Sequence, residues 1–272
     1  MYVFTIILWL LSLLTSSSFL IFFEWYDKWY LILVSVLLLP ILYVVWAAIL
    51  LTIIFIWSLF LSKKKEITKP NKFYYFFVRE VAHQIDLLGR VKVVVRGEEK
   101  LPKEKSMIVS NHLSMFDAVC IVDKIKSQPL MCISKMENLR IPICGPFIYN
   151  AGFIPLDRSN AHKAVKCIQR AASYIENDSA HIYICPEGTR SKSGELLPFH
   201  AGSFKIATKS NAPIVVCNFK NTDLVHKNFP WKKTVVYLDI IEVIYPEQYK
   251  GKNTTQIAEE CSLLIENFQK KE

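Results

Sequence analysis

Two side chains suited to proton transfer, His112 and Asp117, stand five positions apart after a short apolar run. That run, residues 107–109, is typical of a buried strand. If a helix follows, a carboxylate one turn into it can fold back onto the imidazole. An imidazole held by a carboxylate can take a proton from a hydroxyl during acyl transfer. The substrate's own hydroxyl can then attack, so the protein needs to supply no covalent nucleophile.

A simpler interpretation covers part of this segment. Ser114 and Asp117 have the spacing of a capping box, with Ser114 as the N-cap and Asp117 as the third helical residue. That interpretation accounts for the serine and the aspartate. It leaves unexplained why Asn111 and His112 occupy the turn between the strand and the helix.

Two further segments favour an anionic ligand. The first is C-P-E-G-T-R at residues 185–190, where the proline and glycine also suit a simple turn. Gly188 lets the backbone approach a ligand, and Thr189 and Arg190 offer donors suited to phosphate. The second is G-F-I-P-L-D-R at residues 152–158, which ends on Arg158. One arginine at the end of a strand is usually a solvated charge, whereas two favour an anion site.

The order of these segments resembles the glycerolipid acyltransferase family, whose best-known bacterial members are the 1-acyl-sn-glycerol-3-phosphate acyltransferases. The matching blocks are N-H-x-x-x-x-D, G-F-I-P-L-D-R, P-E-G-T-R and A-P-I-V, and the resemblance covers roughly residues 91–219. It implies that His112 is a general base and that Asp117 orients it. It also implies a pocket for the phosphate of the acyl acceptor, with these substrate-binding residues: Asn111, Lys135, Arg158, Glu187, Gly188, Thr189 and Arg190.

The chain departs from the family pattern at one position. His200 stands where many family members carry a lysine. A neutral histidine would hold phosphate or coenzyme A only weakly, which bears on the choice of acyl donor. Lys135 is also open to a second interpretation, because an exposed lysine needs no function. Pro213 in the last block is expected to be architectural.

Short apolar runs alternate with helical patterns through residues 63–272, which predicts an α/β fold. The expected architecture is a mostly parallel or mixed central sheet flanked by helices. In such sheets, sites lie in the loops after the strands. The predicted strands are 91–96, 106–110, 130–134, 153–156, 181–185, 214–219 and 234–241; the predicted helices are 115–126, 160–176, 202–210 and 254–269, with another beginning at residue 72.

Residues 1–62 differ in composition from the rest of the chain, because only Glu24, Asp27 and Lys28 are charged. The uncharged run 1–23 is long enough for one membrane span. The run 29–62 has 34 residues, so it must tilt, kink near Pro40 or lie partly in the interface. Tryptophans and tyrosines between the runs resemble an interfacial belt. We therefore predict a membrane-anchoring helical hairpin over 1–62, which either spans the bilayer or dips into one leaflet, and a catalytic domain over 63–272.

Charge and cysteine usage predict a cytoplasmic location for the catalytic domain. Three lysines, Lys63, Lys64 and Lys65, directly follow the second apolar run, which places residue 63 onward on the cytoplasmic side. The seven scattered cysteines have neither metal-ligand spacing nor an even count, which indicates thiols in a reducing compartment. The chain has 33 basic and 24 acidic residues, of which one lysine and two acids lie in residues 1–62. Residues 63–272 therefore have a net charge of +10, which attracts anionic lipid.

The resemblance implies acyl transfer from acyl-CoA or an acyl-acyl carrier protein to the sn-2 hydroxyl of a lysophospholipid, 1-acyl-sn-glycerol 3-phosphate, giving phosphatidic acid. No metal and no bound cofactor are expected. Alternatives are another acceptor, such as glycerol 3-phosphate or a different lysophospholipid, or a catalytically silent membrane lipid-binding module. A nucleic-acid partner is not expected, because the sequence has neither a recognition motif nor zinc spacing.

Overall fold

The computed structural model describes residues 3–62, 67–125, 129–157, 160–191 and 193–271. The chain divides into two compact units, Met1–Leu61 and Ser62–Glu272.

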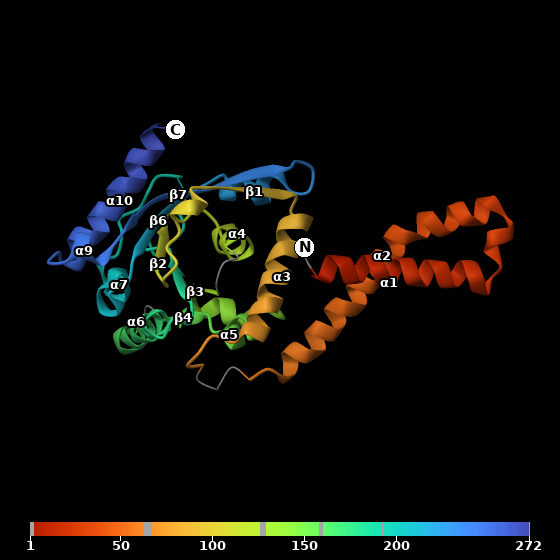
Figure 1. The fold of residues 1–272 in the computed structure, drawn as a ribbon, viewed down its shortest axis with the longest axis horizontal. Coiled ribbons are helices and arrows are strands. Elements are labelled where there is room, and N and C mark those ends of the chain that lie inside the picture. The colour runs from red at the N-terminus through yellow and green to blue at the C-terminus, as the bar shows by residue number, and fades with distance from the viewer. Residues whose placement is uncertain (1–2, 63–66, 126–128, 158–159, 192, 272) are drawn as a thin grey trace. The chain divides into compact units, whose positions relative to one another are not determined.

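The N-terminal unit is a hairpin of two apolar helices, α1 (Val3–Phe22) and α2 (Trp29–Phe60), joined by a 3-10 turn (Figure 1). The helices contact each other through small and polar groups. The Ser16 hydroxyl donates to the Ser35 carbonyl at 2.8 Å, and the Trp46 indole N–H donates to the Thr15 hydroxyl at 3.0 Å. Polar groups thus face the helix–helix contact, while large apolar side chains such as Leu14 and Leu37 point outward.

Both helices are long and apolar enough to cross a membrane, which is consistent with membrane anchoring. The 32 residues of α2 continue through Pro40 without a break. At about 1.5 Å per residue they extend about 48 Å, against a hydrocarbon core of about 30 Å. An upright α2 therefore cannot be buried in lipid along its whole length.

The second unit is built on a seven-stranded sheet with the order β1-β7-β6-β2-β5-β3-β4. All described neighbours pair in parallel except β6 and β7, which are antiparallel. The strands are β1 (Val91–Arg96), β2 (Met107–Ser110), β3 (Leu130–Lys135), β4 (Ile154–Leu156), β5 (His181–Ile184), β6 (Ile214–Lys220) and β7 (Thr234–Ile244).

Helices cover both faces of this sheet (Figure 1). On one face lie α3 (Lys72–Leu88), α4 (Phe116–Lys124) and α5 (Cys144–Ala151); on the other lie α6 (Ala161–Glu176), α7 (Lys205–Ser210) and α10 (Thr254–Lys271). Two short helices, α8 (Val225–Asn228) and α9 (Pro246–Tyr249), flank β7. Because both faces are covered, the central strands β2 and β5 are buried along their whole length. This burial explains why their sequences read as continuous apolar runs.

The predicted fold class is confirmed: a mixed sheet flanked by helices, preceded by apolar helices. The predicted strands are all present, although β7 extends three residues further, to Ile244. The helix α5 was not predicted, because Pro142, Gly145 and Pro146 gave its sequence the character of a loop. The predicted helix at 115–126 is shorter in the structure, from Phe116 to Lys124.

Candidate active site

The candidate site lies where β2 ends and the chain turns into α4. The parallel strands β5 and β6 flank β2, so their carboxyl ends reach the same edge of the sheet. His112 stands in this turn with 24% of its side chain exposed, whereas the side chain of Asp117 in the first turn of α4 is fully buried. The His112 Nδ1 and the Asp117 Oδ2 are 2.8 Å apart. The contact expected from the five-residue spacing is therefore present.

The Asp117 carboxylate is surrounded by donors. Besides the imidazole, Oδ2 accepts the backbone N–H groups of Leu113 at 2.9 Å and Ser114 at 3.0 Å. Oδ1 accepts the hydroxyl of Thr222 at 2.5 Å. When the Nδ1–H of His112 donates to this carboxylate, Nε2 is left as the ring nitrogen that can accept a proton.

The capping interpretation of Ser114 and Asp117 also holds in part. Asp117 accepts the N–H of Ser114, as the third residue of a capping box does. The Ser114 hydroxyl, however, accepts the N–H of Phe116 at 3.3 Å, and α4 begins one residue later than a Ser114 N-cap would require. The same carboxylate therefore orders the helix start and holds the imidazole.

Glu187 braces the backbone of the site. Its Oε1 accepts the N–H of His112 at 2.6 Å, and its Oε2 accepts the N–H of Leu197 at 3.1 Å. Burial raises the pKa of this carboxyl, while the two N–H donors oppose the rise. Nearby, the Ser191 N–H donates to the His112 carbonyl at 2.9 Å. The loop after β5 is thus fixed to the turn that carries His112, and both oxygens of the Glu187 carboxylate accept from backbone N–H groups.

Asn111 has a similar structural commitment. Its side-chain oxygen accepts the N–H of Phe219 at 2.7 Å, and its amide donates to the carbonyl of Phe219 at 2.9 Å. The side chain is buried, so in this arrangement it ties the end of β2 to the end of β6. Asn111 positions the neighbouring His112 and does not present its amide at the surface.

The predicted phosphate-binding residues lie at or near the same edge of the sheet. Gly188 has a φ of +73°, which favours glycine, in the turn after β5. Thr189 and Arg190 follow it and are exposed, and Lys135 is exposed at the end of β3. Arg158 follows β4 but lies outside the described residues. The structure therefore brings Thr189 and Arg190 to the loop that contacts His112, with their donors accessible to a ligand.

Cys185 is a neighbour of His112 that the sequence analysis did not single out. One nitrogen of His112, one carboxylate oxygen of Asp117 and the Cys185 thiol lie within 4.8 Å of one another. The sulfur also lies 3.1 Å from the Tyr183 hydroxyl. Three such groups could hold a metal ion, but three N–H donors already occupy Asp117 Oδ2. The cluster fits a hydrogen-bonded histidine–aspartate pair with a thiol beside it better than it fits a metal site.

Opposing effects act on the basicity of His112. Burial lowers its pKa, but the hydrogen bonds with Asp117 and with Cys185 outweigh burial, so the pKa lies above the usual 6.5. The imidazole is consequently a stronger base than in water, while a smaller fraction of it is neutral near pH 7.

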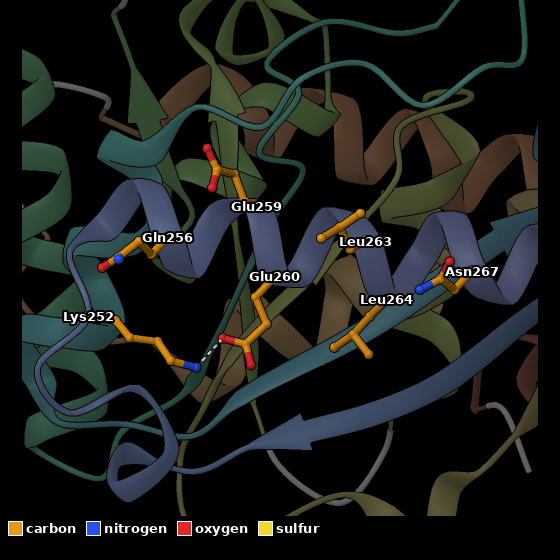
Figure 2. A pocket seen from close by; sticks show the side chains of 7 residues that line it. All are labelled: Lys252, Gln256, Glu259, Glu260, Leu263, Leu264 and Asn267. Carbon is orange, nitrogen blue, oxygen red and sulfur yellow. Dashed lines mark hydrogen bonds and ion pairs between the residues drawn. The ribbon is translucent and has the colours of Figure 1, made fainter.

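A second functional residue that sequence reasoning missed is Thr222, which holds Asp117 from a turn after β6. The two residues are 105 positions apart, and no motif marks the threonine. A groove beside α10 contains none of the predicted site residues (Figure 2). It is lined by Lys252, Gln256, Glu259, Glu260, Leu263, Leu264 and Asn267.

Comparisons with known proteins match this region to one family. The Acyltransferase family model matches residues 92–220. A chloroplastic 1-acyl-sn-glycerol-3-phosphate acyltransferase of Brassica napus is 33% identical over 154 residues, which cover 56% of this chain and 44% of that protein. The 1-acyl-sn-glycerol-3-phosphate acyltransferase of Haemophilus influenzae is 29% identical over 179 residues, covering 63% of this chain and 73% of the relative. This chain thus spans less than half of the plant relative and about three quarters of the bacterial one.

A solved structure agrees with these matches. The crystal structure of the 1-acyl-sn-glycerophosphate acyltransferase PlsC from Thermotoga maritima superposes with a TM-score of 0.54 at 26% sequence identity. The superposition covers 71% of this chain and 81% of that structure. The matched residues 92–220 include His112, Asp117 and the loop of Glu187. Residues 92–220 therefore match the Acyltransferase family model, and the resemblance of the chain to the 1-acyl-sn-glycerol-3-phosphate acyltransferases is confirmed.

Proposed function

We propose that this chain transfers a fatty acyl group from an acyl thioester to the free sn-2 hydroxyl of 1-acyl-sn-glycerol 3-phosphate, giving phosphatidic acid. The observation that carries the proposal is the contact of 2.8 Å between Nδ1 of His112, whose side chain is 24% exposed, and the buried carboxylate of Asp117, just past the carboxyl end of β2. A binding module would not need a base held in this way. The named relatives support the choice of acceptor.

In the proposed mechanism, His112 Nε2 takes the proton of the acceptor hydroxyl as its oxygen attacks the thioester carbonyl carbon. Asp117 stabilises the imidazolium that forms. When the tetrahedral intermediate collapses, the carbon–sulfur bond breaks and the proton on Nε2 passes to the departing thiolate. Phosphatidic acid and a free thiol are the products. The steps need proton transfer and orientation only, so no metal and no bound cofactor is proposed.

In this proposal, cationic and hydroxyl groups at the edge of the sheet orient the acceptor. We assign the acceptor phosphate to Thr189 and Arg190, with Arg158 and Lys135 as further cations. A guanidinium can hold a phosphate through two parallel hydrogen bonds. Fixing the phosphate in this way holds the sn-2 hydroxyl near His112 and converts binding energy into a favourable attack geometry.

The test is a product assay with purified protein. Lysophosphatidic acid is supplied with acyl-CoA in one reaction and with acyl-acyl carrier protein in another, and both free thiol and phosphatidic acid are measured. We expect phosphatidic acid with at least one donor. Product from glycerol 3-phosphate or another lysophospholipid, but not from lysophosphatidic acid, would assign a different acceptor. Lipid binding without any transfer would make the chain a silent binding module.

We also propose that residues from 63 onward lie on the cytoplasmic face of a membrane. The lysines at 63–65 support this orientation, and the seven cysteines are all free thiols. A cysteine placed at the exposed Glu259 should react with a membrane-impermeant maleimide only after the cells are opened. Labelling in intact cells, with an extracellular cysteine as the positive control, would contradict the orientation.

A further inference from the structure

An exposed apolar and basic surface lies on the second unit, outside the candidate active site. Its most exposed members are Trp231 at 85%, Leu88 at 70% and Phe229 at 53%. Exposed basic side chains lie beside them in the sequence. We call this surface the rim patch, and it consists of Leu88, Arg90, Phe229, Trp231, Lys232 and Lys233.

The sheet topology places the rim patch on the same edge as His112. Thr234 at the start of β7 pairs with Val91 at the start of β1, so the segments before these strands lie together. Since β7 runs antiparallel to β6, with Lys220 opposite Tyr237, both starts lie at the carboxyl end of β6. Figure 1 shows β1 and β7 side by side and α3 ending where β1 begins.

Thr222 connects this end of the sheet to the catalytic pair. It is the second residue after β6 and donates its hydroxyl to Asp117. Thr234 lies three residue steps before Tyr237, so the start of β7 extends about 10 Å past the end of β6 at about 3.3 Å per residue. The rim patch therefore projects from the edge that carries the site.

Hydrogen bonds hold the two segments of the rim patch together. The Arg90 guanidinium donates to the carbonyl of Pro230 at 3.3 Å and to that of Trp231 at 3.2 Å. The Thr234 N–H donates to the Arg90 carbonyl at 3.1 Å. These bonds use backbone carbonyls, which leaves the Trp231 and Phe229 side chains exposed on a fixed backbone.

We propose that the rim patch rests on the surface of a lipid bilayer that contains anionic lipid, and that it seats the site edge against that bilayer. Tryptophan is favoured at the level of lipid head groups, and adjacent lysines are attracted by anionic lipid. This proposal rests on the proposed function, because it takes the acceptor to reside in the bilayer. Such an acceptor must reach His112 from the side of the molecule that carries the rim patch. The same chain also contains two helices that are long and apolar enough to cross a membrane, and such an anchor would hold the second unit near a bilayer.

The first experiment separates membrane delivery from chemistry. The full chain is reconstituted in vesicles of phosphatidylcholine and phosphatidylglycerol and supplied with acyl-CoA. The acceptor is either long-chain lysophosphatidic acid in the vesicles or a short-chain, water-soluble analogue. We expect Trp231→Ala to lower turnover of the vesicle-bound acceptor by roughly tenfold, the scale for one large apolar side chain leaving an apolar environment. The pair K232E and K233E should lower it by at least as much, since each lysine near anionic lipid contributes about 1 kcal/mol. Turnover of the soluble analogue should not change.

The matched control is Leu263→Ala, which removes an exposed apolar side chain from α10 (Figure 2), a helix that contains no residue of the rim patch. It should leave both turnovers at the wild-type level. The second experiment does not depend on activity. The difference between the tryptophan fluorescence of the wild type and of Trp231→Tyr reports Trp231 alone, and we expect brominated lipid to quench it.

The outcomes distinguish this proposal from its rivals. Equal losses on both acceptors, or a difference fluorescence that brominated lipid leaves unquenched, would overturn it. A loss seen only when acyl carrier protein replaces acyl-CoA would also overturn it and would assign the rim patch to an acidic protein donor. If the wild type transfers no acyl group but Trp231 is quenched, the proposed function fails while the rim patch stands as a membrane contact.

Discussion

At the scale of single residues, the pair His112 and Asp117 carries the proposed chemistry, so its removal should abolish turnover and spare the fold. We expect His112→Ala to lower turnover by about 10²–10⁴-fold, the range for loss of a general base. The measurement is the initial rate of thiol release at saturating acceptor. The matched control is His226→Ala, which removes an exposed histidine on α8. Wild-type rates in His112→Ala would refute the assignment.

Thr222 is a positioning residue, because it acts on substrate only through Asp117. Thr222→Val removes the hydroxyl donor and leaves a buried carboxylate oxygen without it. We expect a cost of about 1–3 kcal/mol in the free energy of unfolding, together with a lower turnover number and an unchanged KM for the acceptor. Thr222→Ser keeps the donor and should restore most of the activity. If Ser and Val behave alike, the hydrogen bond has no role in positioning Asp117.

The pH profile reports on Cys185. The base must be neutral to accept a proton, so the rate rises with pH through the pKa of His112. Burial lowers this pKa, and the contacts with Asp117 and Cys185 raise it above 6.5. Cys185→Ala removes one raising contact, so the rising limb of kcat/KM should move to lower pH. Cys144→Ala on α5 is the control and should leave the limb in place. A limb that stays fixed in Cys185→Ala would contradict this account of the His112 pKa.

At the scale of elements, the contact between α3 and α4 buries an acid that should make stability depend on pH. Burial first, and the charge of Asp123 second, raise the pKa of Asp86 from 3.8 to about 7. The folded chain therefore holds this proton more tightly than the unfolded chain. The resulting stability is fully present below pH 3.8 and is lost as pH rises through 7. At about 1.4 kcal/mol per pH unit, its upper limit is about 4 kcal/mol.

Asp86→Asn should accordingly raise the melting temperature at pH 8 and change it little at pH 4. An asparagine oxygen can still accept from the Cys120 thiol, as Asp86 Oδ1 does at 3.7 Å. Thermal unfolding of the detergent-solubilised chain at both pH values measures the effect. Glu259→Gln, an exposed change on α10, is the control. Equal melting shifts at pH 4 and pH 8 would show that Asp86 does not titrate in this range.

The elements differ in how far their sequences predicted them. The strands β2 and β5 were predictable because complete burial requires continuous apolar residues. The helix α5 was not predictable, because its proline and glycine residues are typical of a turn. In the structure this helix packs mainly against α3. At the site, the five-residue spacing predicted the contact between His112 and Asp117. Thr222 and Cys185 could not be assigned, because only the folded sheet brings the ends of distant strands together.

At the scale of the whole molecule, charge should govern access to a membrane-bound acceptor. Residues 63–272 carry a net charge of +10, which anionic lipid attracts. We expect turnover of lysophosphatidic acid in anionic vesicles to fall as salt rises from 0.01 to 1 M, because the screening length falls from about 30 to about 3 Å. Vesicles of phosphatidylcholine alone are the control. A salt response of the same size in both kinds of vesicle would mean that surface charge is not responsible.

The central claim is that His112 catalyses acyl transfer to lysophosphatidic acid. The most direct measurement is phosphatidic acid formed by the purified full chain from acyl-CoA and from acyl-acyl carrier protein, with wild type and His112→Ala side by side. The account predicts product with the wild type and at least one donor, and its loss in His112→Ala. Product that persists in His112→Ala, or wild-type protein that binds lysophosphatidic acid and transfers nothing from either donor, would contradict it.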